Sequence, residues 1–292
     1  MDWEKGEESE NLEDRRGVSR RTLAIGGGVG AGILLLIASL LGFDPQKLNQ
    51  FFGNPPGGKG GGNGQVEERS ATPEEQRSRK FSATILRFTE VVWDEQFRKN
   101  GKRYVPPHMV LFTDEVATGC GNAPSAVGPF YCPADRTVYL DPTFFDELEK
   151  KLGGSKAEFS QAYVIAHEVG HHVQNLLGYS HRVEQMRREL PKEEYNKWSV
   201  RLELQADYLA GVWAYYGQKK FNFIEPGDIE SAIKSANAIG DDRLQKRARG
   251  FTSPEKYTHG RSDQRVKWFR LGLETGDLKK LDEIFKMPYD EL

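Results

Sequence analysis

The 292-residue sequence predicts an α+β fold that is mostly helical with a small sheet, preceded by one membrane-spanning helix and a glycine-rich linker. Several runs carry apolar residues at helical spacing, short segments rich in β-branched and aromatic residues lie between them, and one apolar run near the N-terminus carries no charge. With 37% apolar residues, the chain is long enough for one good-sized domain with appendages. Its net charge of −2 gives no electrostatic argument for nucleic acid as a partner.

The N-terminal region has the pattern of a membrane anchor. Residues 22–43 are uncharged and about as long as a bilayer-crossing helix. Four arginines precede them: Arg15, Arg16, Arg20 and Arg21. By the positive-inside rule, residues 1–21 would be cytoplasmic and the remainder would be held on the extracytoplasmic side of the cell membrane. A cleaved signal peptide and a buried soluble helix are the alternatives.

Glycines inside the apolar run have spacings that suit helix pairing in a membrane. They are Gly26, Gly27, Gly28, Gly30 and Gly32. This pattern allows a homodimer through the membrane segment. Residues 44–72 are predicted to be a flexible linker, because seven of the twelve residues from 53 to 64 are glycine.

The folded domain is predicted to span residues 73–292. Thr72 is the expected N-cap of its first helix, with Pro73 at the first helical position and Glu75 completing a capping box. The segments 108–112 and 136–141 are predicted strands. A helix over 142–152, capped by Asp141, and a further helical run over 226–248 are expected downstream.

Cys120 and Cys132 are the only cysteines, and they enclose a loop rich in glycine and proline. If the domain lies outside the cytoplasm, they should form a disulfide worth about 3 kcal/mol. Two reduced core cysteines are the alternative. A second metal site is not expected from them, because neither belongs to a CxxC pair.

The segment 159–178 is a predicted helix that contains His167-Glu168-Val169-Gly170-His171, an HExxH motif. Histidines four apart on a helix share one face, so both imidazoles can bind one Zn²⁺. Glu168 is rotated away from them, which lets its carboxylate reach a metal-bound water. Gly170 costs about 1 kcal/mol relative to alanine in a helix, which indicates that a neighbouring backbone or the metal site needs the space.

A second sequence element, downstream of HExxH, also supports the metal site. A chance occurrence of the five-residue HExxH pattern would not be accompanied by a matching element of this kind. Glu203 and Asp207 are four apart in the helical run 195–216, beside an apolar stripe. Glu203 is the predicted third ligand, and Asp207 is predicted to accept the free ring N–H of His167. His181 is the alternative third ligand.

The motifs together resemble a known family. HExxH followed by a glutamate helix resembles the glutamate-type zincins, of which thermolysin is the familiar member, and ELQAD resembles the CAAX-protease-like membrane metallopeptidases. The chain as a whole is most similar to the bacterial membrane-anchored neutral zinc metallopeptidases, through blocks that cover nearly all of residues 110–270: CGN, GPFYCPAD, AHEVGHHVQ, ELQAD and THG followed by QR.

This resemblance implies a zincin-like domain with one Zn²⁺ and a protein or peptide substrate. In zincins, a histidine or tyrosine outside the ligand set helps to stabilise the oxyanion, so His259 and Tyr257 are the candidates here. Arg265 is expected to pair with a buried acid. The segment 136–141 is the candidate edge strand for an extended substrate, although a purely structural strand remains open.

The expected activity is peptide-bond hydrolysis with Glu168 as general base. A non-catalytic, membrane-tethered zinc scaffold or chaperone-like module is the alternative, and hydrolysis of another amide, such as a cell-wall peptide link, is a third. The 31 residues between His171 and Glu203 depart from the thermolysin spacing, so pocket details do not transfer.

Overall fold

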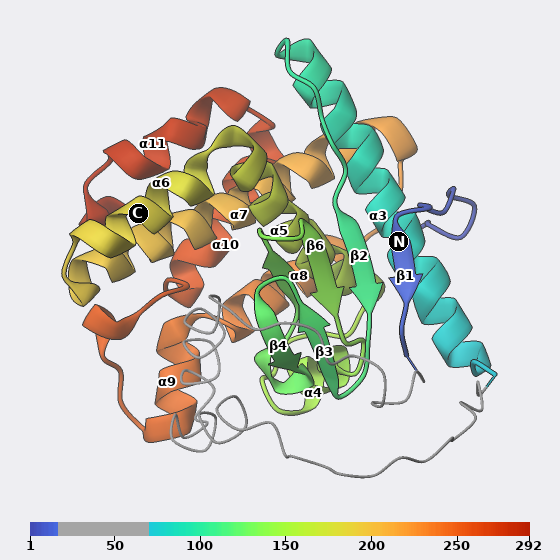
Figure 1. The fold of residues 1–292 in the computed structure, drawn as a ribbon, viewed down its shortest axis with the longest axis horizontal. Coiled ribbons are helices and arrows are strands. Elements are labelled where there is room, and N and C mark those ends of the chain that lie inside the picture. Colours follow the sequence, from blue (N-terminus) through green and yellow to red (C-terminus); the bar gives the residue numbers. More distant parts are fainter. Residues whose placement is uncertain (17–69) are drawn as a thin grey trace, which may run out of the picture.

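In the computed structural model, which describes residues 1–16 and 70–292, helices cover one face of a small mixed sheet (Figure 1). The α-helices are α3 (Pro73–Lys99), α4 (Phe144–Lys150), α5 (Glu158–Leu177), α6 (Tyr179–Glu189), α7 (Lys192–Phe221), α8 (Asp228–Ala238), α9 (Asp241–Arg249), α10 (Ser262–Thr275) and α11 (Glu283–Lys286). The strands are β1 (Leu12–Asp14), β2 (His108–Leu111), β3 (Glu115–Thr118), β4 (Gly121–Pro124), β5 (Phe130–Cys132) and β6 (Thr137–Leu140). Short 3-10 turns occupy Ser125–Val127, Pro254–Lys256, Leu278–Asp282 and Tyr289–Glu291.

The main sheet has the strand order β1-β2-β6-β5, and β3 pairs with β4 in a separate hairpin. β1, β2 and β6 are parallel, whereas β5 runs antiparallel to β6. Alternate side chains point to opposite faces. Met109 and Leu111 therefore join the helical core, while Val110 and Phe112 join a smaller cluster with the β3–β4 hairpin.

The N-terminal segment is part of the folded domain. The predicted division separated residues 1–21 from a domain at 73–292, yet β1 pairs in parallel with β2, and Trp3 is buried against α3. Local sequence patterns do not show a strand of three residues whose partner lies about a hundred positions later. The predicted membrane helix at 22–43 and the linker from 44 to 69 lie outside the described residues. Within the described part of the chain, no helix is long and apolar enough to span a membrane.

The prediction for the substrate-binding edge strand was wrong. The predicted strand at 136–141 is present as β6, but β6 is paired on both sides, with β2 and with β5. The edge of the sheet next to α5 is β5 instead. The order of strands depends on contacts between distant segments, so position along the chain does not reveal it.

Of the other local predictions, some were confirmed and some differ from the structure in their bounds. Thr72 caps α3, and the reciprocal capping box with Glu75 is present. The helix expected over 142–152 spans Phe144–Lys150, so it begins later and ends earlier. Asp141 accepts hydrogen bonds from the backbone N–H and hydroxyl of Thr143 at 2.9 and 2.7 Å, which is the kind of contact expected of a capping side chain. The run over 226–248 is divided into α8 and α9. The predicted disulfide between Cys120 and Cys132 is present, with 5.9 Å between the Cα atoms.

Candidate metal centre and catalytic cleft

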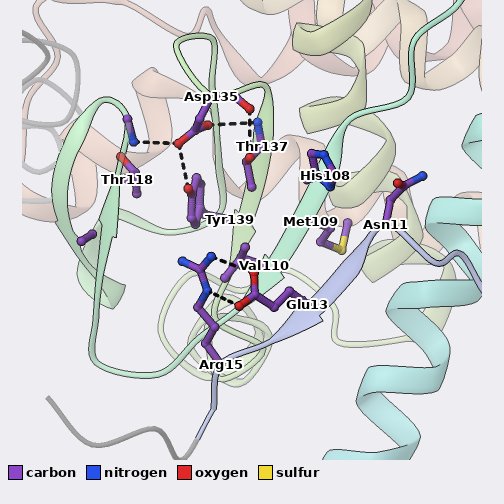
Figure 2. A pocket seen from close by; sticks show the side chains of 12 residues that line it. Asn11, Glu13, Arg15, His108, Met109, Val110, Thr118, Asp135, Thr137 and Tyr139 are labelled. Carbon is purple, nitrogen blue, oxygen red and sulfur yellow. Dashed lines mark hydrogen bonds and ion pairs between the residues drawn. The ribbon is translucent and has the colours of Figure 1, made fainter. Parts of the chain in front are cut away.

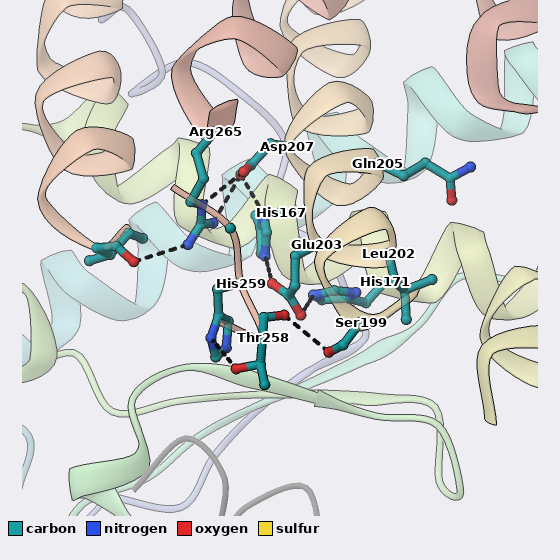
Figure 3. A network of polar contacts seen from close by, with 12 residues as sticks. His167, His171, Ser199, Leu202, Glu203, Gln205, Asp207, Thr258, His259 and Arg265 are labelled. Atoms are coloured by element: carbon teal, nitrogen blue, oxygen red, sulfur yellow. Dashed lines mark hydrogen bonds and ion pairs between the residues drawn. The ribbon is translucent and has the colours of Figure 1, made fainter. Parts of the chain in front are cut away.

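Helices α5 and α7 carry the residues of the predicted metal site, and they cross closely at the HExxH motif (Figure 3). Gly170 lies at this crossing. A Cβ atom there would lie 3.1 Å from the carbonyl oxygen of Ala206 and 3.4 Å from the side chain of Leu209. The glycine therefore allows the backbone of α7 to approach α5, which brings Glu203 to the two histidines.

His167, His171 and Glu203 meet at one point. Glu203 Oε2 lies 3.3 Å from His167 Nε2, and Glu203 Oε1 lies 3.5 Å from His171 Nε2. The donor atoms of the three residues all lie within 4.8 Å of one another. A tetrahedral zinc ion with bonds of about 2.0–2.1 Å separates its ligand atoms by roughly 3.3 Å, so the spacing fits one zinc ion.

The hydrogen bonds made by the Nδ1 atoms of the two histidines explain why this site fits a cation. His167 Nδ1 donates to Asp207 Oδ1 at 2.8 Å, and His171 Nδ1 donates to Gln174 Oε1 at 2.8 Å. Each Nε2 then faces the Glu203 carboxylate, and in the neutral imidazole it carries a lone pair. Two lone pairs and a carboxylate repel one another unless a positive charge lies between them, and neutral imidazole with carboxylate is a donor set that zinc prefers.

The electrostatics of the site also favour positive charge. Burial lowers the pKa of His167, but the carboxylates of Asp207 and Glu203 outweigh burial and raise this pKa to about 10. Burial raises the pKa of Glu203, but His171, His259 and His167 hold it well below its usual range. Both shifts have the same cause, since carboxylate groups and the histidines stabilise each other's charged forms in this buried pocket.

Asp207 connects the metal site to the rest of the core. Its Oδ1 atom accepts hydrogen bonds from the Tyr163 hydroxyl at 2.6 Å and from His167. Arg265, from α10, donates to Oδ2 at 2.8 Å and to Oδ1 at 3.0 Å (Figure 3). The predicted contact with His167 is thus present, and the buried acid expected to pair with Arg265 is Asp207. Burial would raise the pKa of Asp207, but Arg265 and His167 lower it to about 2.

Glu168 lines the same cleft without joining the group of three ligand residues. It follows His167 directly on α5 and is therefore turned about 100° around the helix axis. Burial raises its pKa, as does Glu203, and the neighbouring histidines oppose the shift. A carboxylate with a raised pKa beside a metal site suits proton transfer near neutral pH.

His259 reaches the cleft from the loop between α9 and α10. The Asp241 carboxylate holds this loop, because Oδ2 accepts the backbone N–H groups of Thr258, His259 and Gly260 at 2.7, 2.6 and 3.0 Å. His259 Nδ1 lies 3.4 Å from Asp241 Oδ1 and 3.1 Å from the Thr258 hydroxyl. Burial lowers the pKa of His259, but Glu203 and Asp241 raise it overall.

Tyr257 does not reach the cleft. Among the described residues, those that line the cleft include His259 but not Tyr257. The side chain of Tyr257 is buried in the main core, and it makes a hydrogen bond with Thr252. Two residues separated by one position in a loop need not face the same way, and only one of the two candidates lines the cleft with the metal-binding residues.

The other histidines of this region lie away from the metal site. His172 donates from Nε2 to the Val105 carbonyl at 2.7 Å and accepts from the Tyr131 hydroxyl at 3.0 Å. Burial lowers its pKa to about 4. This histidine therefore ties the edge strand β5 to α5. His181, the alternative third ligand, lies on α6 and is not in the metal-binding group found among the described residues.

The cleft around these groups has a volume of about 460 Å³. One part of its wall is apolar: Val127, Phe130, Phe144, Leu152, Val164, Ile239 and Leu244. α6 contributes a more polar end with Ser180, Glu184 and Arg187. Phe130 and Tyr131 of β5 also line the cleft, so the edge of the sheet borders the metal site.

Comparison with known proteins agrees with this site. Residues 1–284 match the family described as "Putative neutral zinc metallopeptidase". The chain belongs to this family. It is 43% identical over 284 residues to the "Uncharacterized protein YpfJ" of Escherichia coli (strain K12), covering 95% of this chain and 96% of that protein. The "Uncharacterized protein Rv2575" of Mycobacterium tuberculosis (strain ATCC 25618 / H37Rv) is 48% identical over 183 residues, covering 60% of this chain and 61% of that protein. No solved structure gives a significant match.

Three residues of this metallopeptidase site were not found from the sequence. Each of them holds a predicted functional group by a hydrogen bond: Asp241 holds His259, Tyr163 holds Asp207, and Gln174 holds His171. Asp241 follows a glycine at a helix start, where an acidic residue is common and indicates no special role. Gln174 lies three positions after His171, so helical spacing was a usable signal for that residue alone.

Proposed function

We propose that this metallopeptidase cleaves peptide bonds with one Zn²⁺ held by His167, His171 and Glu203. The observation that carries the proposal is the convergence of two imidazole Nε2 atoms on one carboxylate, beside the buried carboxylate of Glu168. Bound there, the ion would supply a Lewis acid that polarises a carbonyl and acidifies water.

Glu168 acts as the proton carrier. Its carboxylate takes a proton from the attacking water and later delivers that proton to the leaving amine. Burial is the main cause of its raised pKa, so the group accepts the proton more readily than an exposed glutamate would.

His259 stabilises the negative oxygen that develops on the substrate carbonyl. The Glu203 and Asp241 carboxylates raise the pKa of His259, and Asp241 also holds its backbone, so the imidazole is kept in place as a hydrogen-bond donor. A pre-positioned donor of this kind costs no reorganisation during the reaction.

An extended peptide segment fits the cleft by pairing with β5. β5 pairs with β6 on one side, and its other edge has no strand partner among residues 1–16 and 70–292. A substrate backbone can hydrogen-bond along that edge, while the apolar wall receives a side chain next to the cleaved bond. The proposed substrate is therefore a protein or peptide in extended conformation.

The non-catalytic zinc scaffold explains the cleft less well. A purely structural zinc site is closed by four protein ligands, whereas here three ligand residues face an open cleft. A scaffold also has no use for Glu168. Anchoring at the cell membrane, an extracytoplasmic domain and a homodimer through the membrane glycines remain proposals that depend on residues outside the described part.

Substitution of Glu168 by glutamine tests the proposed chemistry. The full-length variant should keep one zinc per chain and lose turnover of a mixed peptide library by about 10²–10⁴-fold, because only the proton carrier is removed. Glu184→Gln, at the polar end of the same cleft, is the matched control and should retain activity. A zinc-loaded Glu168→Gln protein with normal turnover would refute the assigned role.

A further inference from the structure

The first sixteen residues, here called the N-terminal arm (Met1–Arg16), continue the sheet of the catalytic domain. Leu12, Glu13 and Asp14 pair in register with Met109, Val110 and Leu111. The backbone hydrogen bonds extend beyond the strand, from Met109 N–H to Asn11 O at 2.9 Å and from Arg15 N–H to Leu111 O at 2.8 Å. The arm therefore covers the edge of β2, which would otherwise be open.

The arm is also packed into the hydrophobic core. The Trp3 side chain is only 2% exposed, and its ring packs edge-to-face on Phe81 with 5.1 Å between centroids. Gly6 lies directly on α3, where an added Cβ would come within 2.5 Å of Thr84 and 2.8 Å of Phe88. Contacts this close show a surface shaped to fit the arm.

Buried polar groups depend on the arm as well. Ser9 and Asn11 both donate to Oε1 of Glu90, at 2.5 and 2.8 Å. Glu90 lies on α3 and is 6% exposed, so removing the arm would cost this carboxylate two of its hydrogen bonds.

Charge complementarity extends along the surface of α3. Three basic residues of the helix pair with acids of the arm: Arg77 with Glu4, Arg79 with Glu8 and Arg87 with Glu7. Each exposed pair contributes little to stability, but together they match an acidic segment to a basic helix face.

The charged end of the arm lines a cavity of about 470 Å³ on the face of the sheet opposite the helices (Figure 2). Glu13 and Arg15 form an ion pair there, across from Tyr139 and Asp135. The family match also begins at residue 1, so it includes the arm.

We propose that the N-terminal arm is a permanent strand of its own chain's catalytic domain, and that the two occupy the same side of the membrane. A single crossing at residues 22–43 would place them on opposite sides and would forbid the β1–β2 pairing. This proposal differs from the predicted topology, in which the arm is cytoplasmic and the domain extracytoplasmic, and it does not depend on the proposed catalytic activity.

Cysteine labelling of the full-length protein in spheroplasts tests the shared compartment. Glu7→Cys in the arm and Lys286→Cys in the domain provide reporter sites, because these side chains are 82% and 74% exposed. The native cysteines are joined to each other and do not react. With a membrane-impermeant maleimide, both reporters should label in intact spheroplasts, or both only after permeabilisation. Labelling of one without the other would overturn the proposal.

A cross-link tests the pairing itself. Glu13 and Val110 are register partners, and neighbouring strands lie about 4.7–4.9 Å apart, which suits a disulfide. Full-length Glu13→Cys/Val110→Cys in isolated membranes, treated with an oxidant, should give an intramolecular disulfide identified by peptide mapping. Glu13→Cys/Lys286→Cys is the control and should not cross-link within one chain. No disulfide in the first variant, or only one that joins two chains, would overturn the assignment.

Discussion

Replacing Asp207 with asparagine tests whether the negative charge of Asp207 is needed to orient the zinc ligand His167 and to balance Arg265. Asparagine keeps the shape of the side chain but removes the carboxylate that lies between His167 and Arg265. Asp207 is fully buried, and Arg265 is 3% exposed, so the variant leaves a buried guanidinium without its counter-ion.

Two magnitudes follow from this geometry. The pKa of Asp207 is lowered from 3.8 to about 2, which corresponds to about 2.5 kcal/mol of stabilisation of the ionised form. Breaking a buried ion pair by removing one partner costs about 3–5 kcal/mol, so we expect the free energy of unfolding to fall by about 3 kcal/mol. Loss of the hydrogen bond that orients His167 should weaken zinc binding about 10–100-fold.

The two effects need separate assays. Urea unfolding in the presence of a chelator measures stability without the contribution of bound zinc. Competition with a chromophoric chelator measures zinc affinity. In the double variant Asp207→Asn/Arg265→Met, the guanidinium is also removed, so part of the lost stability should return while zinc binding stays weak. Zinc affinity equal to that of the unaltered protein in Asp207→Asn would refute the role of Asp207 in orienting His167.

The same pKa shift predicts acid sensitivity of the metal-free protein. A carboxyl group whose pKa is lowered on folding contributes stability above its ordinary pKa of 3.8, and that contribution is lost as the pH falls toward 2. Unfolding free energies measured from pH 6 to pH 2 should decline through this window. The decline should be smaller in Asp207→Asn, and an identical decline in both proteins would contradict the shift.

Further outcomes follow from the same structure. Trp3→Ala should lower the free energy of unfolding by about 3–5 kcal/mol in urea titrations, because the arm loses its main apolar contact, whereas Phe251→Ala at an exposed site should change it by less than about 0.5 kcal/mol. A small effect of Trp3→Ala would mean that the arm is not part of the folded core. His259→Ala should reduce kcat about 10²–10³-fold with zinc content unchanged, and Tyr257→Phe should leave kcat unchanged; the reverse pattern in steady-state assays would move the oxyanion role to Tyr257. Chelation should abolish turnover and lower the thermal midpoint, with both restored by added zinc, and turnover that survives metal removal would argue against a zinc peptidase.

The sequence by itself determined the parts of the site that obey helical periodicity. Residues four apart share a helix face, so sequence spacing alone assigns the HExxH pair to one helix face and the Glu203–Asp207 pair to another. The capping box of α3 is likewise a local pattern, in which two residues three positions apart satisfy each other's backbone N–H groups. These predictions depend only on bonds and turns within a few residues.

Tertiary structure alone decided which segments meet. The strand order placed β5, and not β6, at the edge beside the cleft, and it added residues 12–14 to a sheet formed about a hundred residues later. The three N–H groups that donate to the Asp241 carboxylate belong to a loop segment that begins 17 positions further along the chain. The same loop directs His259 into the cleft beside the metal-binding residues and Tyr257 into the core. Such contacts are selected by the burial of the whole core, which no short stretch of sequence encodes.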